Sequence, residues 1–358
     1  MLDVSLTHVS NFALRDVSLT FPASTHTAIV GPPASGATTL LRLIAGTLKA
    51  DSGEIRFGTR VVNGLRASQR PVLFATAEID APARWSVRHV LVAAVKRRTL
   101  DRIDRQHEYE LAIEKWSLRA ILDRRVRTLS DSERTSVNLA RIELLRPGIL
   151  LADRVLERLN PAASDEIIDK FYRTLRVSGA TVLSAPAYRV ELGVTDRVIV
   201  LSNGRIVQEG STAHVYSRPA DEAAARATGE INIVPVSIDG TSVESAMGSW
   251  DVATAPFQGS GVALVRPESF SVAEAGKESD VIVAVEEAAF ESGRWIVRAM
   301  LSGGLTLRIA LPANASIHKG KLLALSYDPS RFVLIQREME APRRTVPVDV
   351  LPPMRNSR

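Results

Sequence analysis

Residues 31–40 read GPPASGATTL, and their types and spacing fit most of a phosphate-binding pattern. That pattern is G-x-x-x-x-G-K-[ST], in which backbone N–H groups and a hydroxyl hold the anion while the lysine adds positive charge. Gly31, Gly36 and Thr38 occupy the glycine and hydroxyl positions, but Ala37 stands in place of the lysine. The stretch predicts a phosphate loop without its cation; the alternative is a plain strand-to-helix turn that uses glycine for a positive φ.

The flanking residues favour the phosphate loop. HTAIV (26–30) predicts a buried strand, and TTLLRLIAGTL (38–48) has apolar residues at helical spacing. A strand, a glycine turn and a helix point the free N–H groups of the helix start at an anion. Similar patterns predict further strands at 14–21, 52–58, 71–75, 148–153, 180–185 and 196–207, and helices at 132–145 and 164–177, with mostly helical, arginine-rich residues at 86–127.

Composition sets the broad class of the protein. The chain has 358 residues, enough for two or three domains, and 45 Lys and Arg against 40 Asp and Glu, so its positive charge is only a weak indication of an anionic partner. The absence of cysteine excludes disulfides, cysteine-ligated zinc and thiol catalysis. We see no signal peptide and no run of 18 apolar residues, and expect a cytosolic protein that reaches a membrane through partners.

The pattern of predicted secondary structure changes near residue 231, from helices that alternate with strands to a series of short strands with alternating apolar and polar residues. This pattern predicts an all-β unit of the small barrel or sandwich kind. Small barrels can bind oligonucleotides, but this segment does not interleave aromatic and basic residues, so we expect no nucleic-acid partner. The last residues, 341–358, contain proline and arginine without periodicity and predict a loosely ordered tail.

Several later segments carry a resemblance to a known family. LSDSERTSVNLARIELLRP starts at Leu129 and is similar to an L-S-G-G-Q signature, and ILLADRVLERLNP places Asp153, at a Walker B metal position, 23 residues after Ser130. Further landmarks are VTDRVIVLSNGRIVQEGS, VRPES (265–269) and SYDPSRFVLI (326–335). In this order, over residues 1 to 336, they resemble the ATP-binding subunits of ABC transporters, and the β-rich end resembles the maltose-type solute importers.

The resemblance implies a fold, a domain division and partners. The expected fold is an α/β P-loop NTPase-type ABC ATPase domain with an inserted helical subdomain, followed by an all-β OB/TOBE-like accessory domain. The expected boundaries are 1–230 for the ATP-binding domain, about 81–135 for its helical subdomain, 231–340 for the regulatory domain and 341–358 for the tail. The implied partners are a second ATP-binding subunit, transmembrane permease subunits and, indirectly, a solute-binding protein, at the cytoplasmic side of the cell membrane. A sugar is the solute type that this subfamily implies.

The resemblance also implies the site residues. The expected ligands are ATP and Mg, both bound weakly because Ala37 removes a charge-assisted contact. The expected metal positions are Thr38 and Asp153. The expected nucleotide-binding residues are Gly31, Ser35, Gly36, Ala37, Thr38, Thr39 and Ser130. Ser130 faces the nucleotide of a partner subunit in that family, and Phe12 is the candidate for stacking on the adenine.

The catalytic positions of that family hold other residues here, so we assign no catalytic residue. Arg154 replaces the glutamate that polarises water, and arginine cannot accept a proton at neutral pH. The glutamine, D-loop aspartate and switch histidine are replaced by Ala75, Asn160 and the region of Pro186. In the signature, Asp131 and Ser132 replace two glycines, which adds a carboxylate where phosphate is expected.

The interpretation that follows is an ATP-binding subunit of an importer with little or no hydrolysis of its own, paired with a competent second subunit. One alternative is a regulatory or scaffold protein outside any transporter. Another is an ATPase with rearranged catalytic residues. For Arg154, the alternatives are a cation that replaces the missing lysine charge near the phosphates, or an ordinary surface ion-pair residue.

Overall fold

The computed structural model describes residues 3–159, 164–273 and 280–337, and the chain divides into unit 1 (Met1–Glu230) and unit 2 (Ile231–Arg358). The predicted tail at 341–358 and the substituted D-loop position Asn160 lie outside the described residues.

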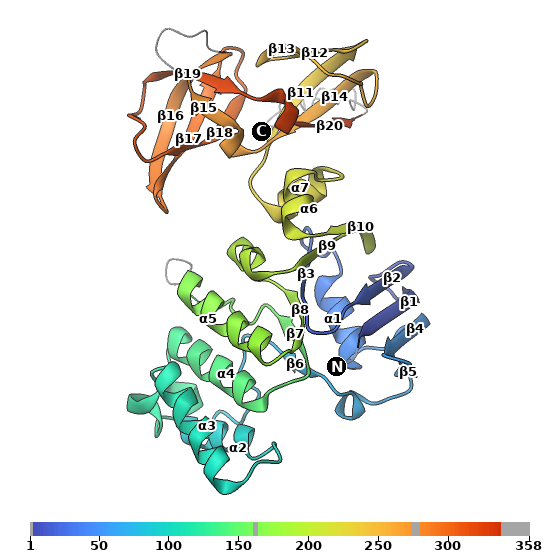
Figure 1. Cartoon of the computed structure of the whole chain (residues 1–358), viewed down its shortest axis with the longest axis vertical. Coiled ribbons are helices and arrows are strands. Elements are labelled where there is room, and N and C mark those ends of the chain that lie inside the picture. The colour runs from blue at the N-terminus through green and yellow to red at the C-terminus, as the bar shows by residue number, and fades with distance from the viewer. Residues whose placement is uncertain (1–2, 160–163, 274–279, 338–358) are drawn as a thin grey trace, which may run out of the picture. The chain divides into compact units, whose positions relative to one another are not determined.

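The main sheet of unit 1 has the strand order β10-β9-β3-β8-β7-β6, with β10 antiparallel to β9 and the other neighbours parallel (Figure 1). Every residue of β3, β7 and β8 is buried, as expected for parallel strands covered on both faces. The strands are β3 (His26–Val30), β6 (Leu73–Ala75), β7 (Ile149–Asp153), β8 (Thr181–Ala185), β9 (Arg197–Ser202) and β10 (Arg205–Gly210).

Alternation along β7 divides the core of unit 1 into two layers. Leu150 belongs to the apolar cluster under the helices α4 and α5, whereas Leu151 belongs to the cluster of α1 and a second sheet. That second sheet is antiparallel, in the order β2-β1-β4-β5. Its strands are β1 (Val4–Ser10), β2 (Val17–Phe21), β4 (Ser52–Phe57) and β5 (Arg60–Val61).

Seven α-helices are present in the described residues, and all belong to unit 1. Helices α2, α3 and α4 pack on one another and form the helical region between β6 and β7 (Figure 1). None of the described helices is long and apolar enough to cross a membrane. The helices are α1 (Ala37–Ala45), α2 (Val87–Val95), α3 (Arg102–Lys115), α4 (Asp131–Leu145), α5 (Ser164–Val177), α6 (Thr212–Ser217) and α7 (Glu222–Thr228).

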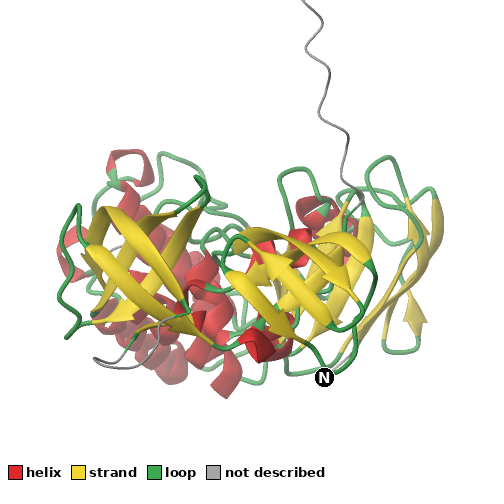
Figure 2. Cartoon of the chain, turned by 90° about the horizontal axis from the view of Figure 1, so that it is seen from above, coloured by secondary structure: helices red, strands yellow, loops and turns green. Residues whose placement is uncertain are grey.

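Unit 2 is built from strands joined by loops and short helical turns (Figure 2). Its two five-stranded sheets, in the orders β13-β12-β11-β14-β20 and β15-β19-β16-β17-β18, share one apolar cluster. The strands are β11 (Asn232–Asp239), β12 (Ser242–Ser245), β13 (Gly248–Asp251), β14 (Gly259–Val265), β15 (Phe270–Val272), β16 (Val281–Glu291), β17 (Arg294–Leu301), β18 (Thr306–Pro312), β19 (Leu322–Tyr327) and β20 (Val333–Gln336). The expected α/β domain followed by an all-β domain is confirmed.

Two local expectations were wrong. The residues 196–207 form a hairpin rather than one strand, because Asn203 and Gly204 both adopt positive φ and turn the chain between β9 and β10. Strand β1 was not expected at all. It lies between β2 and β4, and its alternating buried positions face the apolar cluster of α1.

Candidate nucleotide-binding cleft

The loop between β3 and α1 keeps the backbone that a phosphate loop needs. Gly36 is the N-cap of α1 with φ 106°, and a Cβ there would lie 2.6 Å from Leu14 Cδ2. A Cβ on Gly31 would lie 2.0 Å from the carbonyl oxygen of Leu201. Both glycines are therefore required by the packing of the loop itself, and the left-handed conformation of Gly36 is one that other residues rarely adopt.

The start of α1 is open. No side chain caps its first turn, and that turn contains no acidic residue. At its other end the buried Arg70 donates from Nη1 to the carbonyl oxygens of Leu43 and Ile44, at 2.7 and 2.8 Å. The N-terminal amides of α1 therefore remain available, and the positive end of the helix dipole is not neutralised by a side chain of its own first turn.

The two predicted metal positions meet beside this loop. Thr38 Oγ1 donates a hydrogen bond of 2.8 Å to Oδ1 of Asp153, the last residue of β7. Asp153 is only 7% exposed, and its hydroxyl partner lies in the first turn of α1. A hydroxyl and a carboxylate oxygen are ligands that suit Mg²⁺, which takes its other ligands from phosphate and water. These two residues thus fit part of a magnesium site.

A cleft of about 990 Å³ surrounds the loop, and its volume lies at the upper end of the range for small-molecule sites. The predicted residues Gly31, Ser35, Gly36, Ala37, Thr38 and Thr39 all line it. Phe12 also lines the cleft and is 83% exposed, so its ring is free to stack on a planar ligand. The amide cradle, the ring and the cleft volume fit ATP, whereas Ala37 contributes no charge.

Arg154 lines the cleft directly after Asp153. It has φ 50°, a left-handed conformation that costs a non-glycine residue about 1–2 kcal/mol. Its N–H donates to the carbonyl of Ala185 at 2.9 Å, which joins the ends of β7 and β8. Its Nη2 donates to Glu157 Oε1 at 3.0 Å, and both side chains are 52% exposed. An exposed pair of this kind contributes little to stability, so the guanidinium can change partner.

Hydrogen bonds made by two side chains hold the segment where a switch histidine is expected. The Glu191 carboxylate, 1% exposed, accepts hydrogen bonds from the N–H groups of Ala187 and Tyr188, at 2.7 and 2.9 Å. Burial raises the pKa of Glu191 above its ordinary value. The Tyr188 hydroxyl donates to the carbonyl oxygens of Glu157 and Leu159. Backbone hydrogen bonds therefore fix this loop, and Pro186 offers no proton acceptor on its side chain.

The signature segment is arranged differently from the loop. Ser130 is the N-cap of α4 and forms a capping box with Glu133. The Ser130 N–H donates to Glu133 Oε2 at 2.8 Å, and the Glu133 N–H donates to Ser130 Oγ at 3.3 Å. Asp131 pairs with Nη1 of Arg158 at 2.9 Å, and Nη2 of Arg158 pairs with Glu78. Side chains of this same chain already satisfy the start of α4.

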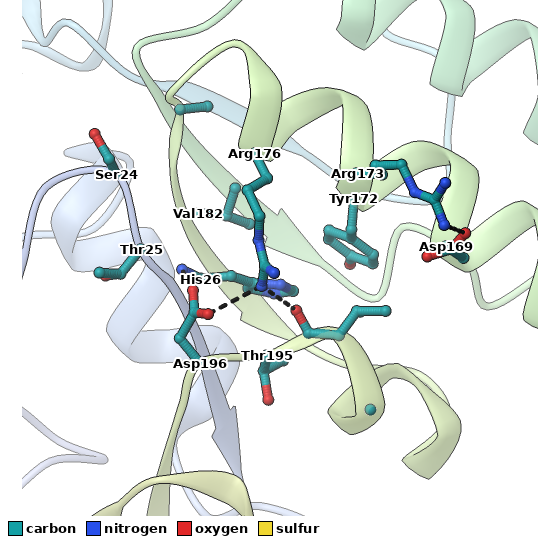
Figure 3. Close-up of a pocket in the computed structure, with 13 residues that line it drawn as sticks. Ser24, Thr25, His26, Asp169, Tyr172, Arg173, Arg176, Val182, Thr195 and Asp196 are labelled. Atoms are coloured by element: carbon teal, nitrogen blue, oxygen red, sulfur yellow. Dashed lines mark hydrogen bonds and ion pairs between the residues drawn. The ribbon is translucent and has the colours of Figure 1, made fainter.

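A second cavity, of about 450 Å³, lies at the amino ends of β3, β8 and β9, whereas the loop follows the carboxyl end of β3 (Figure 3). Its wall contains buried His26, whose ring stacks on Tyr172 at 4.4 Å and bonds Ser184 Oγ at 2.8 Å. Burial lowers the pKa of His26 to about 4. Arg176 donates to Asp196 and to the carbonyl of Val194, as the dashed lines in Figure 3 mark. Arg176 and Asp196 thus satisfy one another at this cavity, whereas Nδ1 of His26 is buried without a hydrogen-bond partner among the described residues.

The structure thus brings most of the predicted residues together and leaves Ser130 elsewhere. Ser130 does not line the loop cleft. Sequence reasoning missed the capping box, although the S-x-x-E spacing of Ser130 and Glu133 signals one. It also missed Arg189 and Arg226, which line the cleft from the turn after β8 and from α7. No sequence motif marks these two residues.

Known proteins of one family are similar to this chain in sequence. The sequence profile of a family described as "ABC transporter" matches residues 14–156. The "Molybdate/tungstate import ATP-binding protein WtpC" of Thermococcus kodakarensis is 30% identical over 62% of this chain and 68% of its own length. The "Fe(3+) ions import ATP-binding protein FbpC" of Streptomyces coelicolor is 27% identical over 90% of this chain and 92% of its own. The "sn-glycerol-3-phosphate import ATP-binding protein UgpC" of Rhizobium meliloti is 29% identical over 73% and 74%.

Solved structures agree in fold. The ADP conformation of MJ1267, an ATP-binding cassette of an ABC transporter, matches with a TM-score of 0.53 and 21% identity over 64% of this chain and all of that chain. The cbiO1 protein of Clostridium perfringens matches with a TM-score of 0.53 and 20% identity over 62% of this chain and 92% of that chain.

Proposed function

Because the chain belongs to the family of ABC transporter ATP-binding proteins, we propose that it is the ATP-binding subunit of a solute importer and hydrolyses little or no ATP itself. The proposal of little or no ATP hydrolysis rests on Arg154. It follows Asp153, where the family resemblance implies a glutamate, and it lines the cleft as a cation. A guanidinium cannot accept the proton of an attacking water, and loss of a general base costs about 10² to 10⁴ in rate.

Two further positions support low hydrolysis. Ala75 ends β6 as a buried residue of the core, with no group that could hold a water molecule. In the loop at Pro186, the Glu191 carboxylate already accepts hydrogen bonds from the N–H groups of Ala187 and Tyr188. The remaining residues of this chain therefore bind and orient a ligand rather than move a proton.

The residues that would hold ATP are the amides from Gly31 to Thr39, with Phe12 against the base, and those that would hold Mg²⁺ are Thr38 and Asp153. When bound in this family, ATP supplies the free energy of transport through its hydrolysis. We propose weak binding of ATP, because one charge-assisted contact, worth about 1.5–3 kcal/mol, is missing at Ala37.

A small cavity on the helical region supports docking of permease subunits. It measures about 210 Å³ and lies between residues 80–85, α2 and α4, with Trp85 and Ala93 among its apolar lining. Buried Arg141 donates to Asp80 at 3.0 Å on its wall, and Arg97 adds a second cation. An apolar hollow with charged walls suits a short helix of a membrane protein. The chain accordingly lies peripherally at the cytoplasmic face of the cell membrane.

We propose that a second, catalytically competent ATP-binding subunit completes the transporter. The support is the state of the signature, where Asp131 and Glu133 place two carboxylates in the first turn of α4. Arg158 and Arg124 pair with these two carboxylates, so a partner's bound triphosphate facing this end would have to compete with the carboxylates for both arginines. The relatives are named for iron(III), glycerol 3-phosphate and molybdate or tungstate, so their names do not favour a sugar, and we leave the solute class open. A solute-binding protein would act with the permease.

The test is affinity purification of the tagged full chain from membranes of its native cell, followed by an ATPase assay of the complex. We expect permease subunits and a second ATP-binding protein to be recovered, with hydrolysis unchanged by Asp153→Asn in this chain. Recovery of a homodimer without permease would support the scaffold alternative instead. Hydrolysis by the purified chain alone that Asp153→Asn abolishes would refute the proposed lack of activity.

A further inference from the structure

We propose that the cleft binds the phosphate groups of a nucleotide through arginine side chains, chiefly Arg154, and without a divalent cation. This inference rests on the proposed assignment of the cleft to a nucleotide. It concerns which groups of this chain take the place of the missing lysine and of the metal ion. The family resemblance does not assign these groups.

The charge of the cleft has changed position rather than disappeared. Relative to the family pattern, Ala37 removes one positive charge from the loop. Arg154, which lines the same cleft at the end of β7, replaces a negative charge with a positive one. These two positions together are therefore more positive, by one charge, than the pattern they depart from. An anion in the cleft is attracted to the β7 wall instead of to the loop.

The backbone fixes where Arg154 stands. Its left-handed φ and its N–H bond to Ala185 hold its Cα at the end of β7, directly after Asp153. A strained residue at the wall of a ligand cleft indicates a functional position when the surrounding structure determines it. The pair with Glu157 is exposed and leaves the guanidinium free to rotate toward a phosphate, which arginine binds in a bidentate manner.

Two other arginines reach the same cleft from separate elements. Arg226 of α7 pairs with Glu222 at 2.8 Å, and Arg189 pairs with Glu230. All four of these side chains are at least one-third exposed, so water already screens both pairs. A polyphosphate carries more negative charge than one carboxylate, and it can draw these guanidinium groups from their partners.

The same residues disfavour a divalent cation. In the family pattern two adjacent carboxylates face the metal, whereas here the charge of Arg154 offsets that of Asp153. Oδ1 of Asp153 already accepts a bond from Thr38. In the part of the chain that the structure describes, no group of three or more His, Asp or Glu side chains could hold a metal. A metal would thus depend on Thr38, Asp153 and the phosphates alone.

The test is equilibrium binding of a fluorescent ATP analogue to the purified full chain, with excess Mg²⁺ or with EDTA. We expect the two dissociation constants to agree within about twofold. Arg154→Gln should raise both by about tenfold or more, because it removes a charged hydrogen bond. Arg154→Glu should weaken binding further in EDTA and make it depend on Mg²⁺. Inorganic tripolyphosphate should compete with the analogue, since the arginines contact phosphate and not the base.

Arg173→Gln is the matched control. Arg173 also lies in an exposed pair, with Asp169 on α5, but it lines the other cavity. We expect its dissociation constant to stay within twofold of wild type and both variants to keep the wild-type Tm within a few degrees. Strong Mg²⁺ dependence of the wild type, unchanged binding by Arg154→Gln, or no binding at all would each overturn the inference. Recovery of permease subunits with the chain would survive any of these results, which separates this inference from the proposed function.

Discussion

The starts of α1 and α4 are two versions of one feature, a helix N-terminus at a position where the family binds phosphate. The start of α1 carries no side-chain cap and no acid in its first turn, and it opens into the large cleft. The start of α4 is closed by Ser130 and Glu133, and Asp131 adds a second carboxylate there. The α1 end lacks a side-chain charge but has free amides, while at the α4 end side chains of the same chain occupy the N–H groups of Ser130 and Glu133.

This difference shows that the two helix starts, which both depart from the family pattern, differ in how their amides are used. A free helix end favours an anion by about 0.3–1 kcal/mol, and an acid in the first turn already takes that stabilisation. The α1 end therefore remains a binding feature, and the α4 end has become a stabilising one. In a symmetric pair of copies of this chain, both composite sites would join an α1 end without the lysine to an α4 end capped by its own side chains, which is the physical reason for the unlike partner that we propose.

The largest expected effect comes from closing the α1 end sterically. Gly36→Ala should lower the free energy of unfolding by about 2–5 kcal/mol, from the left-handed backbone and from overpacking against Leu14. Nucleotide binding should be lost as well. Urea denaturation and the fluorescent analogue measure the two effects. Gly64 has no atom within 4 Å of a built Cβ and no positive φ, so Gly64→Ala is the control and should change neither.

Acid should affect the amino end of β3 and the α4 end in different pH ranges. His26 begins β3, which leads into the loop, and its folded pKa of about 4 lies below the ordinary 6.5 because burial disfavours the charged ring. The unfolded state binds more protons between these values, so stability falls by up to about 3 kcal/mol as pH drops from 6.5 toward 4. The Ser130 amide lowers the pKa of Glu133, so that stabilisation is lost only as pH falls below about 4.5.

Burial has the largest influence on the pKa of His26, and the groups that face its ring modify that pKa. Asp196 raises the pKa of His26 and Arg176 lowers it, but both act less than burial does. NMR titration of the imidazole, with urea denaturation across the same range, measures the effect. A histidine signal for residue 26 that titrates near 6.5 in the folded protein would contradict the expected burial.

A smaller effect is expected from opening the α4 end. Ser130→Ala removes the N-cap, and we expect a loss of about 1 kcal/mol in unfolding free energy. Binding in the α1 cleft should not change, because Ser130 lies outside it. Ser86, which caps α2 in the same way, provides the matched variant Ser86→Ala with a similar loss. A fall in nucleotide affinity of the isolated chain on Ser130→Ala would mean that the two ends are not independent.

The sequence was sufficient for the fold and for the loop, since local periodicity and glycine spacing determine both. The strand at His26–Val30 and the helix after Gly36 follow from residues within a few positions of one another. The wall of the cleft could not be predicted. Arg226 lies far along the chain from the loop, and only the packing of α7 near β9 brings it there.

The same limit applies to the signature. From the sequence, Asp131 was expected to add a carboxylate where phosphate is expected. That Asp131 lies in a site shared with a partner subunit stays a prediction. Within this chain Arg158 pairs with it, 27 residues along. Nothing in the spacing of the two residues indicates the contact, because it depends on how the segment after β7 returns past the start of α4.

The open start of α1 also offers a chemical reporter in a chain without cysteine. Ala37→Cys would introduce the sole thiol, in the first turn of a helix whose free amides stabilise a thiolate. Its rate of alkylation would then follow the electrostatic potential at that point, faster in the empty cleft and slower when a bound anion repels the thiolate. Position 37, where the lysine of the pattern is missing, is thus also the position at which the electrostatic potential of the loop can be measured.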